Sequence, residues 1–243
     1  MLIVNADDLG RLKPATDRAL FCFARKRITS TSAMVFMEDS ERAAQLALAS
    51  GIDVGLHINL SESFTADSVP QSLRGYHDRI RRFLKLGKYS LLLYHPFLKT
   101  AFRYVYDAQH AEFLRLYHRE PSHLDGHQHL HLASNMLMQH ILPEGTKVRR
   151  SFSFRPGEKS FANRWYRAAV DRYLARRHRM TDYFFALAHH LTLSSLQPIV
   201  ALADAANVEL MTHPQVPGEY DFLLSDAYAE AVSQVRLAGY DGF

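Results

Sequence analysis

The chain has 243 residues, 47% of them hydrophobic, a single cysteine and a formal net charge of +4. This length and hydrophobic content predict one globular domain covering residues 1–243. The lone Cys22 excludes an internal disulfide framework and indicates a reducing compartment. The opening run "MLIVNADDLG" has no charged leader, and its apolar part ends at two aspartates. We therefore expect no signal peptide, no membrane span and a cytoplasmic location.

Short apolar and β-branched runs in the first quarter of the chain predict buried strands over residues 2–6, 30–37 and 52–60. Helical patterns over 13–27 and 39–51 separate these strands. Because strand and helix alternate at this spacing, the sequence predicts an α/β fold with mostly parallel strands.

The stretch over 61–118 interrupts this alternation. Its first part is long and polar, and the part from 76 onwards is mostly helical, so we expect a helical insertion here. The remaining elements are predicted as strands over 122–127, 146–154 and 207–214, and as helices over 133–142, 161–178, 193–206 and 225–239.

Acidic and histidine-rich motifs fall at the C-terminal ends of four predicted strands. They are "NADD" (5–8), "GLHINL" (55–60), "HLDGHQHLH" (123–131) and "MTHP" (211–214). In parallel α/β sheets and barrels this edge is where functional sites are built. We therefore expect the four motifs to meet.

The first two motifs are ambiguous when taken one at a time. Asp7 and Asp8 leave the first strand side by side, so one could bind a cation while the other handles a proton. Taken alone, such a pair more often caps the following helix. His57 stands in an otherwise apolar strand, where a lone histidine is more often a hydrogen-bonded core residue than a metal ligand.

The third motif concentrates four imidazoles around Asp125. If the segment turns helical, His127 and His131 share a face; if it stays extended, His129 joins them. Several imidazoles converge in either case, and imidazole is a common metal ligand. Not all can bind one ion, so we expect some to orient a ligand or contact substrate. A polar loop with incidental histidines is the alternative.

The fourth motif places His213 at the end of a late strand. Alone it could be a strand-end residue, but beside the other motifs it is a candidate general acid, because histidine transfers protons near neutral pH.

Basic residues cluster in "RIRRFLKLGK" (79–88) and "RYLARRHRM" (172–180). We interpret them as solvated helix faces, and recognition of an anionic or lipid-linked substrate is the alternative. No nucleic-acid-binding motif accompanies them, so no nucleic-acid partner is expected.

The motifs "LIVNADDLG", "GLHINL", "HLDGHQHLH" and "MTHP", in this order, resemble the YdjC-like (ChbG-type) carbohydrate deacetylase family, which is related to the NodB-type polysaccharide deacetylases. The resemblance runs from residue 2 to about 230, with "TDYFFAL" (181–187) also similar. It implies a distorted (β/α) barrel similar to a TIM barrel, and removal of N-acetyl groups from sugars such as chitooligosaccharides.

The resemblance also implies roles for individual residues. Asp8, His57 and His127 would hold one divalent metal ion, Asp7 would be the catalytic base and His213 the acid. Asp125 would orient a ligand, and His129 and His131 would do the same or contact substrate. Mg or Zn is expected, and the ligands would also accept Mn, Co or Ni. A homodimer is possible.

The predicted function is therefore a metal-dependent hydrolase that removes an N-acetyl group from an amino sugar or a short chitooligosaccharide-like substrate. One alternative is a metal-dependent barrel phosphoesterase or sugar isomerase, but such sites generally recruit more carboxylates. The other is a non-catalytic anion-binding protein, which explains none of the four motifs.

Overall fold

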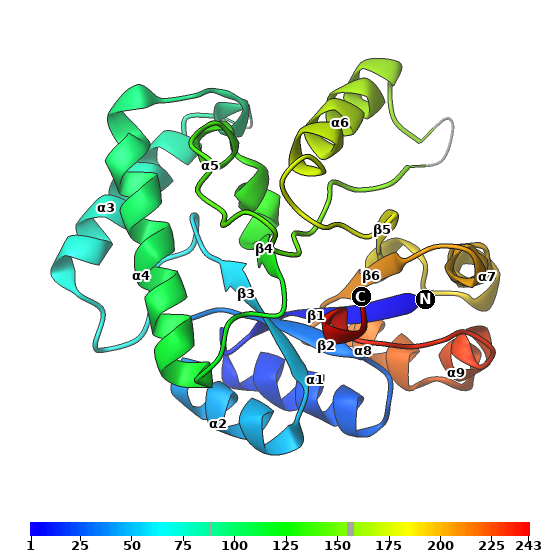
Figure 1. Ribbon diagram of the computed structural model, residues 1–243. Helices are drawn as coiled ribbons and strands as arrows, with labels where there is room; N and C mark the ends of the chain where they lie inside the picture. Colours follow the sequence, from blue (N-terminus) through cyan, green and yellow to red (C-terminus); the bar gives the residue numbers. More distant parts are fainter. Residues whose placement is uncertain (88, 155–157) are drawn as a thin grey trace.

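Six parallel strands form one sheet in a computed structural model that describes residues 1–87, 89–154 and 158–243. The strand order is β4-β3-β2-β1-β6-β5, and the sheet curls into a half-barrel with helices around it (Figure 1). The predicted α/β fold with parallel strands is confirmed. The strands are Leu2–Leu9 (β1), Ser30–Ala33 (β2), Asp53–Ile58 (β3), Leu124–Gly126 (β4), Tyr183–Ala186 (β5) and Val208–Thr212 (β6).

The central strands are buried along their whole length. Every residue of β1, β3 and β6 is buried, because the sheet is covered on both faces. One face is apolar, and the other carries buried polar side chains such as Asn5, His57 and Glu209. The predicted strand over 30–37 is shorter than expected and ends at Ala33.

The predicted strand over 146–154 is wrong, since only isolated parallel bridges form there. Val148 bridges to Leu124 at the β4 edge, and Lys147 bridges to Arg179. Further on, Ser153 N–H donates to Phe184 O. The segment thus crosses from the β4 edge to the β5 edge instead of pairing along one neighbour.

Nine α-helices lie within the described residues. Two of the smaller ones, α5 and α8, flank segments that contribute to the site described below. The helices are Lys13–Ala24 (α1), Ser40–Ser50 (α2), Gln71–Leu84 (α3), Lys99–Tyr117 (α4), Ser134–Met138 (α5), Phe161–Leu174 (α6), Leu193–Val200 (α7), Pro217–Leu224 (α8) and Asp226–Val232 (α9).

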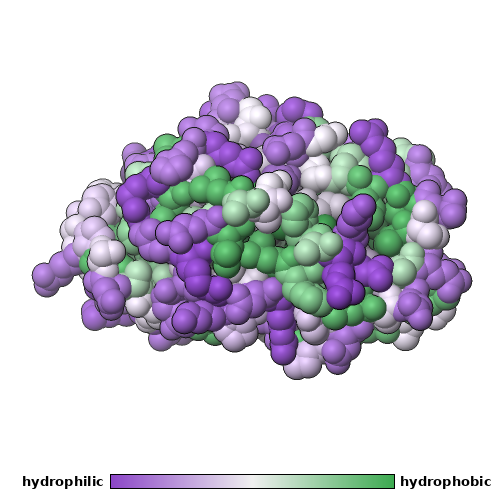
Figure 2. All heavy atoms as spheres, turned by 90° about the horizontal axis from the view of Figure 1, so that it is seen from below, coloured by the Kyte–Doolittle hydropathy of each residue, from purple (hydrophilic) through white to green (hydrophobic). Residues whose placement is uncertain are grey.

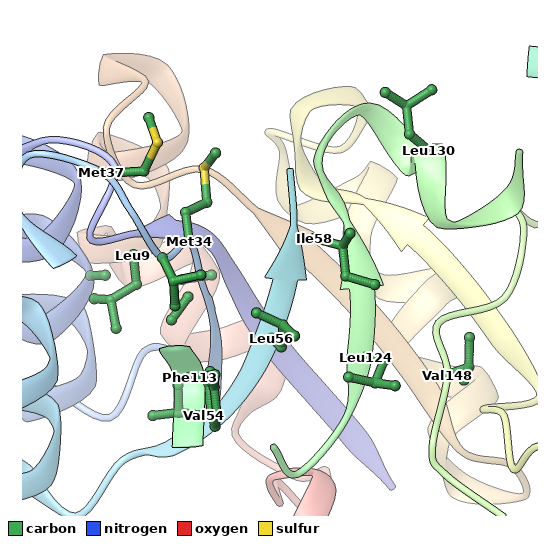
Figure 3. Packing of buried hydrophobic residues seen from close by; sticks show 14 of the residues in the cluster. Leu9, Met34, Met37, Val54, Leu56, Ile58, Phe113, Leu124, Leu130 and Val148 are labelled. Carbon is green, nitrogen blue, oxygen red and sulfur yellow. The ribbon is translucent and has the colours of Figure 1, made fainter. Parts of the chain in front are cut away.

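The helical insertion predicted over 61–118 is confirmed as α3 and α4 with short 3₁₀ turns between them. These two helices pack on each other beside β3 (Figure 1). Figure 3 shows Phe113 of α4 close to Val54, while Leu56 and Ile58 continue the apolar face along β3 and Leu124 lies on the neighbouring strand, paired with Leu56. This packing fixes the strand that carries His57.

Figure 2 views the molecule from below and shows a hydrophobic area bordered by hydrophilic side chains. Exposed apolar side chains are usual on globular proteins, and we infer no partner from them. Within the described residues, no helix is both long and apolar enough to cross a membrane.

Candidate active site

The two aspartates of β1 reach the site because the strand is irregular where it ends. The register between β1 and β2 shifts between Ala6 and Leu9, and Asp8 has a φ of 70°. Positive φ is uncommon outside glycine, and aspartate is one of the residues that adopts it. Successive strand residues normally point to opposite faces. This bulge lets Asp7 and Asp8 both present their carboxylates at the same edge.

Asp8, His57 and His127 come together as the resemblance implies. Asp8 Oδ1 lies 3.4 Å from His57 Nε2 and 3.0 Å from His127 Nδ1. One ligand atom from each of the three residues lies within 4.8 Å of the others, a group that could hold a metal ion. The carboxylate and His57 are buried, and the His127 side chain is 13% exposed. One side of the group therefore stays accessible.

Asp125 lies behind His57 and fixes the orientation of its ring. His57 Nδ1 donates to Asp125 Oδ1 at 2.8 Å, so Nε2 is directed toward Asp8. Burial alone would lower the pKa of His57, but the charges of Asp125 and Asp7 raise it to about 10. A carboxylate behind a histidine is the usual support for a metal-binding imidazole.

Arg149 is a buried residue of this site that the sequence did not single out. Its guanidinium donates to both oxygens of Asp7, each at 2.7 Å, and forms 2.7 Å ion pairs with Asp125 and Glu209. Burial disfavours the charged guanidinium, yet the three carboxylates raise the pKa of Arg149 well above its usual value. One cation thus fixes three carboxylates, including the proposed base.

Glu62, on the loop after β3, is a second residue of the site that the sequence did not single out. It pairs with the guanidinium of Arg11 at 2.8 Å, and Arg11 also pairs with Asp8 at 3.2 Å. Glu62 Oε2 is also 3.5 Å from His127 Nε2. The Asn59 side chain holds the loop, because it accepts from Glu62 N–H and donates to Glu62 O. Glu62 is therefore placed to orient His127 from the side opposite Asp8.

His213 follows β6 and faces the site with a carboxylate partner from α8. Glu219 lies 3.7 Å from His213 Nδ1 and accepts from the His213 backbone N–H at 2.9 Å. Burial would lower the pKa of His213, but Glu219 and the negative charges of Asp7 and Asp8 raise it. Two residues further, Gln215 donates to Asp8 Oδ2 at 2.9 Å.

His129 and His131 do not join the metal-binding group. The segment His127–Leu132 is a 3₁₀ helix interrupted by left-handed φ/ψ values at Gln128 and His129, so its imidazoles diverge. His131 is buried and its Nε2 donates to Arg149 O at 2.9 Å. His129 packs against Phe152 with 4.5 Å between ring centroids. His131 thus supports the backbone of the residue that holds Asp7.

Buried histidines predict a strong loss of stability in acid. Burial lowers the pKa values of His77, His123 and His131 to about 4. Between about pH 4 and 6.5 the unfolded chain therefore binds protons that the folded protein does not. Stability falls as pH drops through this window, by about 3 kcal/mol at most for each group. His57 acts oppositely, because its raised pKa contributes stability that is lost as pH rises toward 10.

The measurement is urea unfolding of metal-free protein at several pH values between 7 and 5. His77→Gln is the matched variant, because His77 donates to Asn59 O and stacks on Phe64, away from the metal-binding group. It should reduce the slope of stability against pH. The same slope of stability against pH in His77→Gln and in the native protein would contradict the prediction.

Comparisons with known proteins identify relatives of this chain. The family model described as YdjC-like protein matches residues 1–234. A carbohydrate deacetylase of Mus musculus is 28% identical over 242 residues, which cover 89% of this chain and 78% of the mouse protein. A chitooligosaccharide deacetylase of Serratia marcescens is 31% identical over 137 residues, covering 54% of this chain and about half, 51%, of that protein.

The fold of this chain is similar to that of one solved structure, with a TM-score of 0.70 and 17% sequence identity. The aligned part covers 99% of this chain and 97% of the other chain. It is a protein from Enterococcus faecalis proposed to cleave cellobiose phosphate. At this identity the likeness shows the fold alone. The match of the family model to nearly the whole sequence decides the family: the chain belongs to the YdjC-like proteins.

Proposed function

We propose that this chain is a metal-dependent hydrolase that removes an N-acetyl group from an amino sugar or a short chitooligosaccharide. The observation that carries the proposal is the grouping of Asp8, His57 and His127 around one point, next to Asp7. The relatives named carbohydrate deacetylase and chitooligosaccharide deacetylase support the reaction.

The three side chains fit a divalent ion. One carboxylate and two imidazoles suit Mg, Zn, Mn, Co or Ni, and this number of ligands leaves coordination positions open for water and substrate. A bound ion would polarise the acetyl carbonyl and lower the pKa of a bound water. Burial of Asp8 raises its pKa, but hydrogen bonds from His127 and His57 hold that pKa well below its usual range. Asp8 is therefore ionised, as a metal ligand must be.

The proton transfers are assigned to Asp7 and His213. Asp7 accepts the proton of the attacking water, and Arg149 fixes both of its oxygens so that the carboxylate keeps one direction. His213 donates a proton to the departing nitrogen, and its raised pKa keeps it protonated to higher pH. His129 and His131 are assigned supporting roles on the Arg149 side.

The arrangement of cations argues against a two-metal phosphoesterase. Asp7, His57 and Asp125 form a second group that could hold an ion. Arg149, however, lies 2.7 Å from both Asp7 and Asp125 and supplies the positive charge there. A second ion would meet the positive charge of Arg149, which favours a single metal ion and disfavours a phosphoesterase of the two-metal type. A cytoplasmic location and a homodimer remain predictions.

The proposal is tested by acetate release from diacetylchitobiose and N-acetylglucosamine, using metal-stripped protein with Zn, Mg, Mn, Co or Ni added back. Phosphate release from p-nitrophenyl phosphate and aldose–ketose conversion of glucosamine derivatives are measured in parallel. Metal-dependent acetate release supports the deacetylase. Phosphate release or isomerisation without acetate would replace it by the corresponding alternative.

Glu62→Gln is expected to weaken metal binding about ten- to hundredfold, because carboxylates behind metal-bound histidines contribute this much. Glu62 Oε2 faces His127 Nε2, and the amide cannot supply its charge. The measurement is metal affinity by calorimetry. Glu120→Gln is the matched control, because Glu120 pairs with His110 at 2.8 Å on the surface. Equal metal affinities in the two variants would contradict the assigned role.

A further inference from the structure

A hollow of about 400 Å³ lies outside the metal-binding group, between α6, the segment over 150–154 and the start of β5. Figure 1 shows α6 standing above β5, apart from α3 and α4 on the other side of the sheet. The volume falls within the range of pockets that hold small molecules. Among the described residues that line it, none belongs to the metal-binding group.

Exposed aromatic rings line the α6 side of this hollow. Phe161 is 81% exposed and Trp165 is 66% exposed. The two residues are four apart in a helix, so their rings lie on the same face. Large flat rings presented together offer a stacking surface for the C–H face of a sugar.

The same hollow contains arginines without a carboxylate partner. Arg150 pairs with Asp171 at 2.8 Å. In contrast, no carboxylate among the described residues lies within ion-pair distance of Arg164 or Arg167. Arg167 is half-buried over Phe154, 5.0 Å from its ring centre, and its Nε donates only to the Asn163 amide oxygen. Burial lowers the pKa of Arg167, against the opposing negative charge of Asp171.

The hollow extends toward the metal-binding group past His129. Phe152 lines the hollow and packs against His129 with 4.5 Å between ring centroids, and His129 is two residues beyond the proposed ligand His127. Phe184 and Arg149, which lie behind Phe152, are fully buried and separate the hollow from Asp7 in the interior. A two-sugar ligand would therefore reach from the hollow to the metal-binding group past His129.

We propose that this hollow binds a carboxylate-bearing sugar, such as a hexuronate, that is linked to the N-acetylated sugar. Its ring would stack on Phe161 and Trp165, and its carboxylate would pair with Arg164 and Arg167. The inference rests on the proposed function and names its substrate class. The described residues that line the hollow include three arginines and two aspartates, and Lys159 Nζ lies 5.4 Å from the lining Phe154 ring. This excess of positive charge favours an anionic sugar. A carboxylate matches the planar fork of a guanidinium, and the titration below separates it from a phosphate.

Trp165 is the only tryptophan of the chain, so its fluorescence reports directly on the hollow. The experiment titrates metal-stripped protein with three probes: a disaccharide of glucuronate and N-acetylglucosamine, neutral diacetylchitobiose, and diacetylchitobiose 6-phosphate. We expect the glucuronate disaccharide to change the fluorescence and to bind about ten- to hundredfold more tightly than the other two. Arg167→Gln should abolish this preference, and Arg176→Gln, an exposed change two residues beyond α6, should leave it intact.

The titration needs neither metal nor turnover, so its failure is distinguishable from failure of the deacetylase assay. Equal affinity for the neutral and glucuronate probes would overturn the inference. So would an unchanged preference in Arg167→Gln. Tighter binding of the 6-phosphate would overturn the assignment to a carboxylate.

Discussion

Asp7→Asn is expected to lower kcat for deacetylation about a hundred- to ten-thousandfold while the protein still binds one divalent ion per chain. Loss of a general base typically has an effect of this size. Metal binding should survive, because the proposed ligands are Asp8, His57 and His127. In the native protein Arg149 donates to both oxygens of Asp7. The asparagine side chain of the variant keeps one oxygen that can accept from Arg149.

Asp8→Asn is the matched variant, since it makes the same chemical change one residue further along β1. It should lose the metal and the activity together. Metal content and acetate release are measured on the same preparations, with circular dichroism to verify folding. If Asp7→Asn lost the metal and Asp8→Asn kept it, the two aspartates would have exchanged roles.

Arg149→Met is expected to lower the free energy of unfolding by about 3–5 kcal/mol at pH 7, because it leaves buried carboxylates without their cation. The Arg149 side chain is fully buried and pairs with Asp7, Asp125 and Glu209. Activity should fall as well, because Asp7 loses the donors that orient it. Urea unfolding measures the change in stability.

The difference in unfolding free energy between Arg149→Met and the native protein should become smaller as the pH is lowered toward 5. Its carboxylates would have raised pKa values, so the folded variant binds protons that its unfolded chain does not and becomes relatively more stable in acid. Arg115→Met is the control, because Arg115 is 54% exposed and pairs with Glu112 at the surface. This exposed pair should change stability by less than about 1 kcal/mol. Equal losses in the two variants would contradict the role of Arg149.

The parts of the fold that the sequence predicted are those with strong periodicity. Strands β1, β3 and β6 carry short apolar runs that predict burial in a parallel sheet, although one face also carries buried polar side chains such as Asn5, His57 and Glu209. The strand expected over 146–154 does not form, although its composition is typical of a strand. The segment instead crosses from one edge of the sheet to the other, and its Arg149 side chain points inward to three carboxylates.

The site was predictable where motif and strand end coincide. Asp8, His57 and His127 meet because parallel strands bring their C-terminal ends to one edge. Arg149 was not predictable, since it stands beside Arg150 and nothing local distinguishes the buried guanidinium from the surface one. Glu62 lies in a polar loop that only the Asn59 hydrogen bonds fix.

The divergence of His129 and His131 from the metal-binding group was also not predictable. Both helical and extended spacings bring imidazoles together, but the observed backbone is left-handed at Gln128 and His129 and follows neither spacing. Gly126 is extended, and a Cβ there would lie 2.8 Å from His131 N. Gly126 therefore allows the backbone of His131 to approach closely. The chain changes direction after Gly126, at the left-handed residues Gln128 and His129.

Metal-dependent deacetylation is tested by a metal titration of stripped protein, with bound ion and acetate release from diacetylchitobiose followed in the same samples. It requires that activity rises in proportion to occupancy and reaches its plateau at one ion per chain, and that His127→Ala shows neither binding nor activity. Acetate release at zero occupancy, or full occupancy in His127→Ala, would contradict it.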